Sequence, residues 1–545
     1  MTLFERILTA RGLTTRAARQ AFLQPDYMAV KHDPFLLPDM KKAVARLKQA
    51  REQGEKIVIY GDYDIDGLSA TALLLDAFGK FGFEDVDAFI PNRFVEGYGM
   101  TMGAVDKVRD MGADLIVTVD TGSLCHAEIA YAASLGIDTV VTDHHNVAET
   151  PPPSVAAVNP KFPGHTYPFR DLCGAGVAFK LVQALQTELD GLPDGYEKWL
   201  LDLVALGTVC DIVTLADENR ANVYWGLEVL KKQQRPGLKA LMAVAGIEPE
   251  QVNARHLGFG LGPRMNAAGR LETAQHALDM LVARDGLAAL EASEKLEELN
   301  GKRRGIQDAI FEEACQQAEE LADNRVLVVS SDGWNHGVIG IVASKLVEKY
   351  KKPVFIIGER GEEATGSARS FGDFSAADAV RAADDIIIKG GGHGAAAGVT
   401  LATGKIGDFR RRVNEFYDSL QLTNQERYLL PRADVEIDDF SEIDEELVAN
   451  LAKMEPFGNG NPEPVLKITR ASVLSMRRMG ADGQHVKLAL RDKNGKVLQM
   501  LAFNAPEEFF REPGDEVVVW FQPTINEWQG VRTVEGRLLH IFLLD

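Results

Sequence analysis

From residue 46 onwards, short apolar runs alternate with amphipathic stretches that have helical spacing. KIVIYG (56–61), DLIVTVD (114–120) and IDTVVTD (137–143) are almost continuously apolar, as strands covered on both faces are. Between such runs, segments such as 67–83 place apolar residues three and four positions apart. This β-α-β-α order predicts a parallel sheet with helices on both faces.

The pattern changes further along the chain. The proline-rich segment 150–161 is typical of a loop at the rim of the first sheet, and 275–322, without proline, predicts one long helix or two stacked helices. A second α/β unit begins at NRVLVVSS, near residue 326. Over 465–545, about five short alternating runs separated by turns predict a small barrel similar to an OB fold.

We therefore expect an α/β protein with two α/β lobes joined by a long helix, followed by a C-terminal OB-like β-barrel. Its expected parts are a helical extension (1–45), a first α/β domain (46–230), a helical connector (231–325), a second α/β domain (326–427) and the barrel (428–545).

Charge and cysteine content restrict the classes of function. The 80 acidic and 59 basic residues give a formal net charge of −21, whereas proteins that coat nucleic acid through their overall field are usually basic. A polyanionic substrate would need a local basic groove or bound cations. The four cysteines are widely spaced and are expected to be reduced thiols. We find no signal-peptide pattern and no apolar run near the ~20 residues that span a bilayer, so we expect a cytoplasmic protein without membrane contact.

Acidic residues and histidines follow several of the apolar runs. They are Asp62, Asp64 and Asp66 after KIVIYG, Asp120 at the end of DLIVTVD, Asp143, His144 and His145 at the end of IDTVVTD, and Asp211 after LVALGTVC. The carboxyl ends of strands in open α/β sheets form the edge at which ligands bind. Four separate segments are thus expected to meet at one site.

Carboxylates that converge within a few ångströms repel one another and stay ionised only if cations lie among them. Five or six aspartates with one histidine suit two divalent cations, Mn²⁺ or Mg²⁺. Two such ions about 3.5–4 Å apart are a common arrangement for hydrolysing phosphoesters. Taken alone, Asp62, Asp66 or Asp143 is better explained as a helix N-cap, a turn former or a support for its neighbours than as a ligand. His144 and His145 cannot both point the same way along a strand, so only one of them is expected to be a ligand.

Four blocks, YGDYDIDG, VTVD, TDHHN and LGTVCDIV, resemble in order and spacing those of the DHH phosphoesterase superfamily. Further blocks between about 57 and 464 resemble the single-stranded-DNA exonucleases of that superfamily. They are IPNRFVEGYG, GPRMNAAGRLE, WNHGVIGIVASKL, GSARS, KGGGHGAAAG and EPFGNGNPEP. The resemblance identifies 46–230 as a DHH catalytic domain, 326–427 as a DHH-associated domain and the barrel as a nucleic-acid-binding domain.

The resemblance implies metal ligands and catalytic residues. Asp64 and Asp66 would hold the ions with Asp62 nearby, Asp120 would bridge them, and His144 and Asp211 would complete the set, with His145 and Asp143 supporting the site or contacting the scissile phosphate. The chain departs from relatives at two positions, Tyr60 in place of a histidine ligand and Thr121 in place of asparagine.

The resemblance also implies a phosphate-binding surface. Its candidates are Ser367 and Arg369 in GSARS, His393 in the glycine-rich run, and Arg93 and Arg264 in loops rich in glycine, asparagine or proline. Tyr98 and Phe94 offer rings for stacking on bases, although packing is the better explanation for Phe94. Arg270 is explained as an ion-pair partner of Glu272. On the barrel, the candidates for contact with DNA are Arg477, Arg478, Lys487, Trp520 and Trp528.

The implied activity is a metal-dependent 5′→3′ exonuclease that degrades single-stranded DNA to 5′-mononucleotides in recombination and repair, with a helicase and a single-strand-binding protein as partners. Two alternatives remain at this point. One is a DHH phosphodiesterase for oligoribonucleotides or cyclic dinucleotides, which does not need the barrel. The other is a catalytically inactive DNA-binding scaffold, which would have lost metal-binding acids that this sequence retains.

Overall fold

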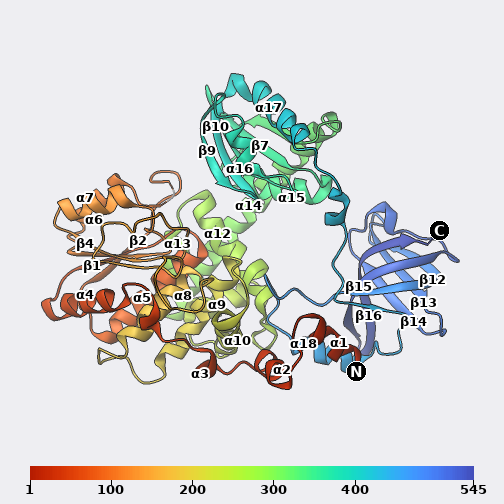
Figure 1. Cartoon of the computed structure of the whole chain (residues 1–545), viewed down its shortest axis with the longest axis horizontal. Coiled ribbons are helices and arrows are strands. Elements are labelled where there is room, and N and C mark those ends of the chain that lie inside the picture. The colour runs from red at the N-terminus through yellow and green to blue at the C-terminus, as the bar shows by residue number, and fades with distance from the viewer. Residues whose placement is uncertain (98, 545) are drawn as a thin grey trace.

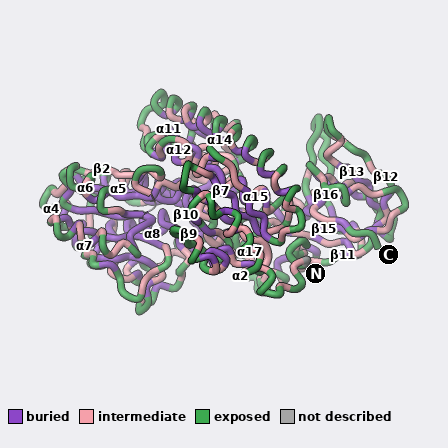
Figure 2. The backbone as a smooth tube through the Cα atoms, turned by 90° about the horizontal axis from the view of Figure 1, so that it is seen from above, coloured by how far each residue is buried: buried purple, intermediate pink, exposed green. Residues whose placement is uncertain are grey.

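A computed structural model of the chain describes residues 1–97 and 99–544. Figure 1 shows a large α/β domain at the left, a smaller one at the top and a β-barrel at the right. The long helix α14 (Gly286–Glu320) leads from the first domain to the second, and Figure 2 shows exposed residues along its outer side. The predicted architecture of two α/β lobes, a long helix and a barrel is confirmed.

The first domain contains a five-stranded sheet that is parallel throughout. In spatial order its strands are β2 (Val86–Phe89), β1 (Ile57–Tyr60), β3 (Leu115–Val119), β4 (Asp138–Thr142) and β5 (Ala156–Val158). The strand β5 lies inside the segment 150–161 that was expected to be a loop, and that expectation is wrong. Its three apolar residues are buried, and they complete the sheet by pairing with β4.

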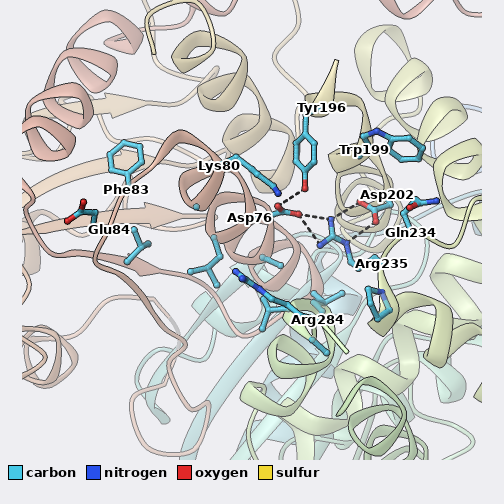
Figure 3. Close-up of a pocket in the computed structure, with 18 residues that line it drawn as sticks. Asp76, Lys80, Phe83, Glu84, Tyr196, Trp199, Asp202, Gln234, Arg235 and Arg284 are labelled. Carbon is cyan, nitrogen blue, oxygen red and sulfur yellow. Dashed lines mark hydrogen bonds and ion pairs between the residues drawn. The ribbon is translucent and has the colours of Figure 1, made fainter. Parts of the chain in front are cut away.

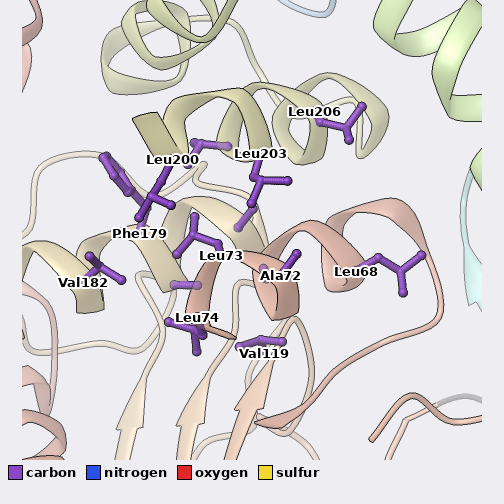
Figure 4. Packing of buried hydrophobic residues seen from close by; sticks show 14 of the residues in the cluster. Leu68, Ala72, Leu73, Leu74, Val119, Phe179, Val182, Leu200, Leu203 and Leu206 are labelled. Atoms are coloured by element: carbon purple, nitrogen blue, oxygen red, sulfur yellow. The ribbon is translucent and has the colours of Figure 1, made fainter. Parts of the chain in front are cut away.

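Helices cover both faces of this sheet, as the continuous apolar runs predict. Along β1, Ile57 and Ile59 pack into one cluster, whereas Val58 and Tyr60 pack into another. The first cluster includes residues of α4 (Met40–Gln53), α5 (Ile65–Phe81), α8 (Gly174–Leu185) and α9 (Leu201–Cys210), and the second includes residues of α6 (Met102–Asp110) and α7 (His126–Ser134). Figure 4 shows the first cluster, where Leu73 of α5 lies close to Phe179 of α8 and Leu203 of α9.

The helices around the first sheet begin and end near the predicted positions, and Gly54 with a φ of 64° ends the first of them. They are α4 (Met40–Gln53), α5 (Ile65–Phe81), α6 (Met102–Asp110), α7 (His126–Ser134), α8 (Gly174–Leu185), α9 (Leu201–Cys210) and α10 (Asp217–Lys231). Three further helices precede α14, namely α11 (Pro236–Val244), α12 (Gly262–Leu271) and α13 (Gln275–Val282). The predicted helical stretch 275–322 is thus two helices.

The second domain is a mixed sheet with helices on its faces. Its strands, in spatial order, are β6 (Leu327–Asp332), β7 (Val354–Arg360), β8 (Glu363–Arg369), β10 (Ala396–Ala402) and β9 (Ile387–His393). The β6–β7 pair is parallel, and the β7–β8, β8–β10 and β10–β9 pairs are antiparallel. The helices are α15 (Ile339–Tyr350), α16 (Ala376–Arg381) and α17 (Ile406–Ser419).

The C-terminal domain is a barrel closed by pairing of its first long strand with its fourth. Its elements are β11 (Val435–Ile437), α18 (Glu445–Ala452), β12 (Leu466–Met479), β13 (His485–Arg491), β14 (Val497–Ala502), β15 (Glu516–Trp528) and β16 (Val531–Leu543). The N-terminal helix α1 (Leu3–Ala10) packs into the core of this domain through Leu3, Ile7 and Leu8. Residues 1–45 therefore contact both ends of the molecule, since Tyr27 and Leu37 lie in the core of the first domain.

Shorter helical segments connect these elements. They are α2 (Arg16–Leu23), α3 (Tyr27–Val30), η1 (Pro34–Leu36), η2 (Tyr196–Leu200), η3 (Pro249–Gln251), η4 (His256–Leu261), η5 (Thr403–Lys405), η6 (Gln425–Leu429) and η7 (Glu507–Phe509). Among the described residues, no helix combines the length and apolarity needed to cross a membrane.

Candidate active site

The carboxyl-end edge of the first sheet gathers the predicted acidic residues. Asp64 is the N-cap of α5, where its Oδ1 accepts a hydrogen bond from the Gly67 N–H at 3.0 Å, and Asp66 lies in the first turn of the same helix. Asp120 follows β3 with a φ of 61°, a backbone conformation that aspartate tolerates better than most residues. Asp211 is the C-cap of α9.

His144 lies at the centre of this group. Its Nε2 is 3.0 Å from Asp120 Oδ1, 3.5 Å from Asp211 Oδ2 and 3.7 Å from Asp66 Oδ2. Residues about 150 positions apart in the sequence therefore meet around one imidazole ring, as the sequence predicts.

Potential ligand atoms form three triads, each with all of its atoms within 4.8 Å of one another. They are Asp120, His144 and His145; Asp66, His144 and Asp211; and Asp62, Asp64 and Asp120. Asp120 and His144 each belong to two triads. This sharing is the arrangement that two neighbouring cations with a common ligand would require.

Asp143 has a different role from the other acids. Its Oδ1 accepts hydrogen bonds from the backbone N–H groups of His144 (2.7 Å) and His145 (3.1 Å) and lies 2.8 Å from His145 Nδ1. Its Oδ2 accepts from the Ser123 N–H at 2.9 Å. Burial acts to raise the pKa of Asp143, but the bond to His145 and its charge outweigh burial and lower that pKa. Asp143 therefore holds the ring of His145 and the backbone of both histidines, whereas the ring of His144 is left to face the other acids.

The remaining acids are costly to keep ionised in this position. Burial, followed by the charge of Asp64, raises the pKa of Asp62 to about 7 and that of Asp66 to about 6. Burial, followed by the charge of Asp66, raises the pKa of Asp211 to about 8 and that of Asp120 well above its usual value. Divalent cations among these carboxylates would remove the repulsion that causes part of these shifts.

The pKa values of the two histidines are shifted in opposite directions. Burial, and then the charge of His145, lower the pKa of His144 to about 4, so its ring is neutral and can donate a lone pair to a cation. Burial acts to lower the pKa of His145, but the hydrogen bond to Asp143 raises it to about 9.

The residues present fit a pair of hard divalent cations. Asp120 Oδ1 and His144 Nε2 are buried, and neither makes a hydrogen bond of acceptable geometry with the part of the chain that the structure describes. Position 174 next to the acids has room only for glycine, because a Cβ there would lie 2.5 Å from Asp120 Cβ. Asp66 is held in place by the N–H groups of Gly174 (2.5 Å) and Ala175 (2.9 Å) at the start of α8.

The two departures from the family pattern have local explanations. Tyr60 is fully buried in the cluster on the other face of the sheet, where its hydroxyl donates to the Gly99 carbonyl at 3.1 Å, so it does not replace a ligand. Thr121 is buried, and its carbonyl accepts from the Thr118 hydroxyl at 2.8 Å.

A group of arginines lies beside the acids. The Arg93 guanidinium lies over the ring of Tyr63, with its Cζ 4.3 Å from the ring centroid. Tyr63 is the residue between Asp62 and Asp64 in the sequence. Burial, and then the charges of Arg93, Arg303 and Arg369, lower the pKa of Arg270 to about 10. Arg270 Nη1 donates to the Gly337 carbonyl of the second domain at 2.8 Å.

The expected ion pair between Arg270 and Glu272 is wrong, because Glu272 pairs with His276 (3.2 Å) and Lys295 (3.1 Å). Arg270 is thus a member of the basic group that sequence reasoning did not assign. Its place in the GPRMNAAGRLE block was the only available signal.

The candidates in the second domain share one face of its sheet. The register pairs Arg369 with Ala396 and Ala396 with His393, so Arg369 and His393 lie in one row across three strands. Ser367 lies two residues before Arg369 on the same face, with its Oγ 3.3 Å from Arg369 Nη1. A Cβ on Gly340, in the first turn of α15, would lie 3.0 Å from Ser367 Oγ, so the start of this helix approaches the pair closely. His393 is exposed at the sheet edge.

Other candidates lie elsewhere than expected. Arg264 is in α12 rather than in a loop, and its Nε is 2.5 Å from Glu297 Oε2, so it ties α12 to α14. The loop assignment of Arg264 is therefore wrong, because the Pro263 that suggested a loop occupies the first turn of a helix, where proline is tolerated. Phe94 is exposed, and Tyr98 lies outside the described residues.

Some of the barrel candidates are exposed, whereas others are buried or already paired with other side chains of the barrel. Trp520 is 8% exposed, with Lys467 Nζ 5.2 Å from its ring, whereas Trp528 is 70% exposed near the end of β15. Lys487 pairs with Glu535 at 2.8 Å and Arg478 with Glu507 at 2.8 Å. Arg477 is exposed.

Away from the acidic site, a hollow of about 850 Å³ lies at the other end of α5 (Figure 3). Arg235 at its wall contacts Asp202 at 2.9 Å and Asp76 at 3.4 Å, and Asp76 accepts from the Tyr196 hydroxyl at 2.9 Å. The buried Arg235 guanidinium is therefore neutralised by Asp76 and Asp202, as in a structural ion-pair network.

Comparison with known proteins identifies the domains of the chain. The N-terminal domain of the DHH family matches residues 56–208, the DHHA1 domain matches 323–419 and the RecJ OB domain matches 433–540. The fold and its acidic centre therefore define a protein of the DHH class. The single-stranded-DNA-specific exonuclease RecJ of Dickeya dadantii is 35% identical over 94% of this chain and 92% of its own length. The chain belongs to the RecJ family.

Two further comparisons extend this result. RecJ of Bacillus subtilis is 39% identical over 96% of this chain, and the chain spans 65% of that relative's length. The crystal structure of Thermus thermophilus RecJ in complex with Mn²⁺ matches with a TM-score of 0.83 and 30% identity, covering 99% of this chain and 76% of that one.

Proposed function

We propose that this chain is a metal-dependent exonuclease that hydrolyses single-stranded DNA from its 5′ end to 5′-mononucleotides. The observation that carries the proposal is the convergence of Asp66, Asp120 and Asp211 on the buried Nε2 of His144. The DNA substrate is supported by the names of the relatives and by the match to an OB domain. Mn²⁺ or Mg²⁺ as cofactor is supported by the T. thermophilus RecJ structures, which are described in complex with each ion.

We assign the candidate ligands to two cation sites. Asp62, Asp64 and Asp120 would hold one ion, and Asp66, His144 and Asp211 the other, with Asp120 close to both. The bound ions would supply activation of water and neutralisation of the phosphate charge. Asp143 fixes the ring of His145, which is 38% exposed beside Asp120 and can donate a hydrogen bond to a phosphate oxygen.

The basic group would hold the substrate. Ser367 and Arg369, on one sheet face with His393, form a surface for a terminal phosphate, because a guanidinium binds phosphate in a bidentate way. Arg93 and Arg270 extend this surface towards the acids. A strand whose 5′-phosphate is anchored in the second domain would present an internal phosphate to the first. By this reasoning the enzyme acts from an end. The resemblance to single-stranded-DNA exonucleases supports the further proposal that its strands are supplied in the cytoplasm by a helicase and bound by a single-strand-binding protein.

The test compares a long 5′-phosphorylated strand with a dinucleotide. We expect faster hydrolysis of the long strand, and preference for the dinucleotide would favour the smaller-substrate phosphodiesterase. Asp120→Ala should abolish hydrolysis, while Asp194→Asn, an exposed acid in the same domain, should not change it. Full activity in Asp120→Ala would refute the assignment of the site.

A further inference from the structure

The turn directly after Asp211 is strained. Ile212 has a φ of 59°, in the left-handed region, although its side chain is β-branched and 69% exposed. A conformation of this kind costs on the order of 1–3 kcal/mol in a non-glycine residue and persists only where the surroundings impose it. A contact from outside α9 must therefore hold the backbone that follows Asp211.

Asn459, almost 250 positions away, contacts both ends of this turn. Its side-chain Nδ2 donates to the Ile212 carbonyl at 2.8 Å, and its own carbonyl accepts from the Leu215 N–H at 2.8 Å. These bonds satisfy a donor and an acceptor of the turn that no helix supplies. Asn459 thus bridges the two ends of the turn at 212–215 that follows Asp211.

The loop that carries Asn459 is fitted closely to the turn. A Cβ on Gly458 would lie 2.8 Å from Leu215 Cδ1, and a Cβ on Gly460 would lie 2.6 Å from Thr214 Cγ2. Gly460 also has a φ of 75°. The glycines of the EPFGNGNPEP block are therefore required for contact between this loop and the catalytic domain, which explains a motif that the metal and phosphate sites leave unused.

Two buried side chains hold the loop in place. Asn461 Nδ2 donates to the carbonyls of Met454 (2.9 Å) and Pro456 (2.8 Å). Arg220 of α10 donates to the same two carbonyls, at 3.1 Å and 3.2 Å, and to that of Glu455 at 2.9 Å. The loop, which lies between α18 and β12 of the C-terminal domain, is therefore fastened to the first domain.

We propose that Asn459 is a positioning residue for Asp211: by holding the Ile212 carbonyl, it keeps the Asp211 carboxylate beside His144. The proposal rests on the proposed function, since Asp211 is assigned there as a metal ligand. It also makes the second cation site depend on a loop that belongs to the barrel end of the chain. Partners of metal ligands commonly contribute 10–100-fold to metal affinity.

The test measures Mn²⁺ binding directly, by electron paramagnetic resonance of free Mn²⁺ in titrations of the metal-free full-length chain. Asn459→Asp is nearly isosteric but cannot donate to Ile212, and Asn459→Ala removes the side chain. We expect at least about tenfold weaker binding of one of the two ions in both variants. Asn494→Ala removes a bond to Asp439 on the barrel surface and should bind both ions as the wild type does.

A second variant tests the mechanism. Glycine adopts a positive φ without strain, so adding Ile212→Gly to Asn459→Ala should recover part of the lost affinity. A merely structural role of Asn459 predicts no such recovery. If Asn459→Asp binds both ions normally while Asp211→Asn loses one, the proposal is refuted and the proposed function stands. If Asp211→Asn keeps both ions, the metal-site assignment itself fails.

Discussion

Asp120 offers the sharpest test of the metal centre, because it belongs to two of the three ligand triads whereas Asp211 belongs to one. Asp120→Asn keeps the volume of the fully buried side chain and removes its charge. If the cations bind only the folded state, each ion stabilises that state by about 2.7 kcal/mol at a free concentration of 100 times its Kd. Two ions would then contribute about 5 kcal/mol in the wild type, about half of that in Asp211→Asn and almost nothing in Asp120→Asn.

Differential scanning calorimetry with and without Mn²⁺ measures these differences. For a domain of 150–250 residues, 1 kcal/mol corresponds to roughly 2–4 °C, so the wild-type shift should be about 10–20 °C. Only the transition of the first domain should move, since the triads lie within it. Asp194→Asn serves as the matched control and should show the wild-type shift.

The apo proteins provide an independent check. Asp120→Asn should unfold at a temperature equal to or above that of the metal-free wild type, because it removes one of several repelling buried carboxylates. A full Mn²⁺-dependent shift in Asp120→Asn would refute the reasoning, since it would show that the ions bind elsewhere.

Three further predictions concern other regions. Arg369→Ala should bring the ratio of hydrolysis rates for 5′-phosphate and 5′-hydroxyl strands close to one; an unchanged ratio would remove its assigned contact. Lys180→Met leaves Glu218 buried without the ammonium group 2.8 Å away and should lower the free energy of unfolding by about 3–5 kcal/mol in urea titrations; a loss below 1 kcal/mol would contradict this. Burial, and then the charge of Glu463, raise the pKa of Glu455 above its usual value. Ionised Glu455 therefore destabilises the folded state at pH values above that raised pKa. This penalty disappears as the pH falls towards the pKa of Glu455 in the unfolded chain. Glu455→Gln should therefore raise the melting temperature at pH 8 and have little effect near pH 4; a constant difference across this range would show that charge is not the cause.

Local pattern predicted most of the fold. The first, third and fourth strands were identifiable because strands covered on both faces need continuous apolar runs, and these runs are visible without knowing the neighbours. The strand β5 was missed because three apolar residues after three prolines carry too weak a local signal, and only pairing with β4 makes them a strand. Arg264 was misplaced for a related reason, since proline suggests a loop unless the following residues are known to form a helix.

By itself, the sequence determined the order of elements and the chemical types that meet at the sheet edge, because parallel strands bring their carboxyl ends to one side wherever the chain forms them. The tertiary structure alone decided what each of those residues does. The ring of His145 is held by Asp143 while that of His144 lies among the other acids, and the partner of Arg270 depends on where the second domain lies. The tie between Asn459 and Ile212 joins segments far apart in the chain, and contacts of that kind leave no periodicity in the sequence from which they could be inferred.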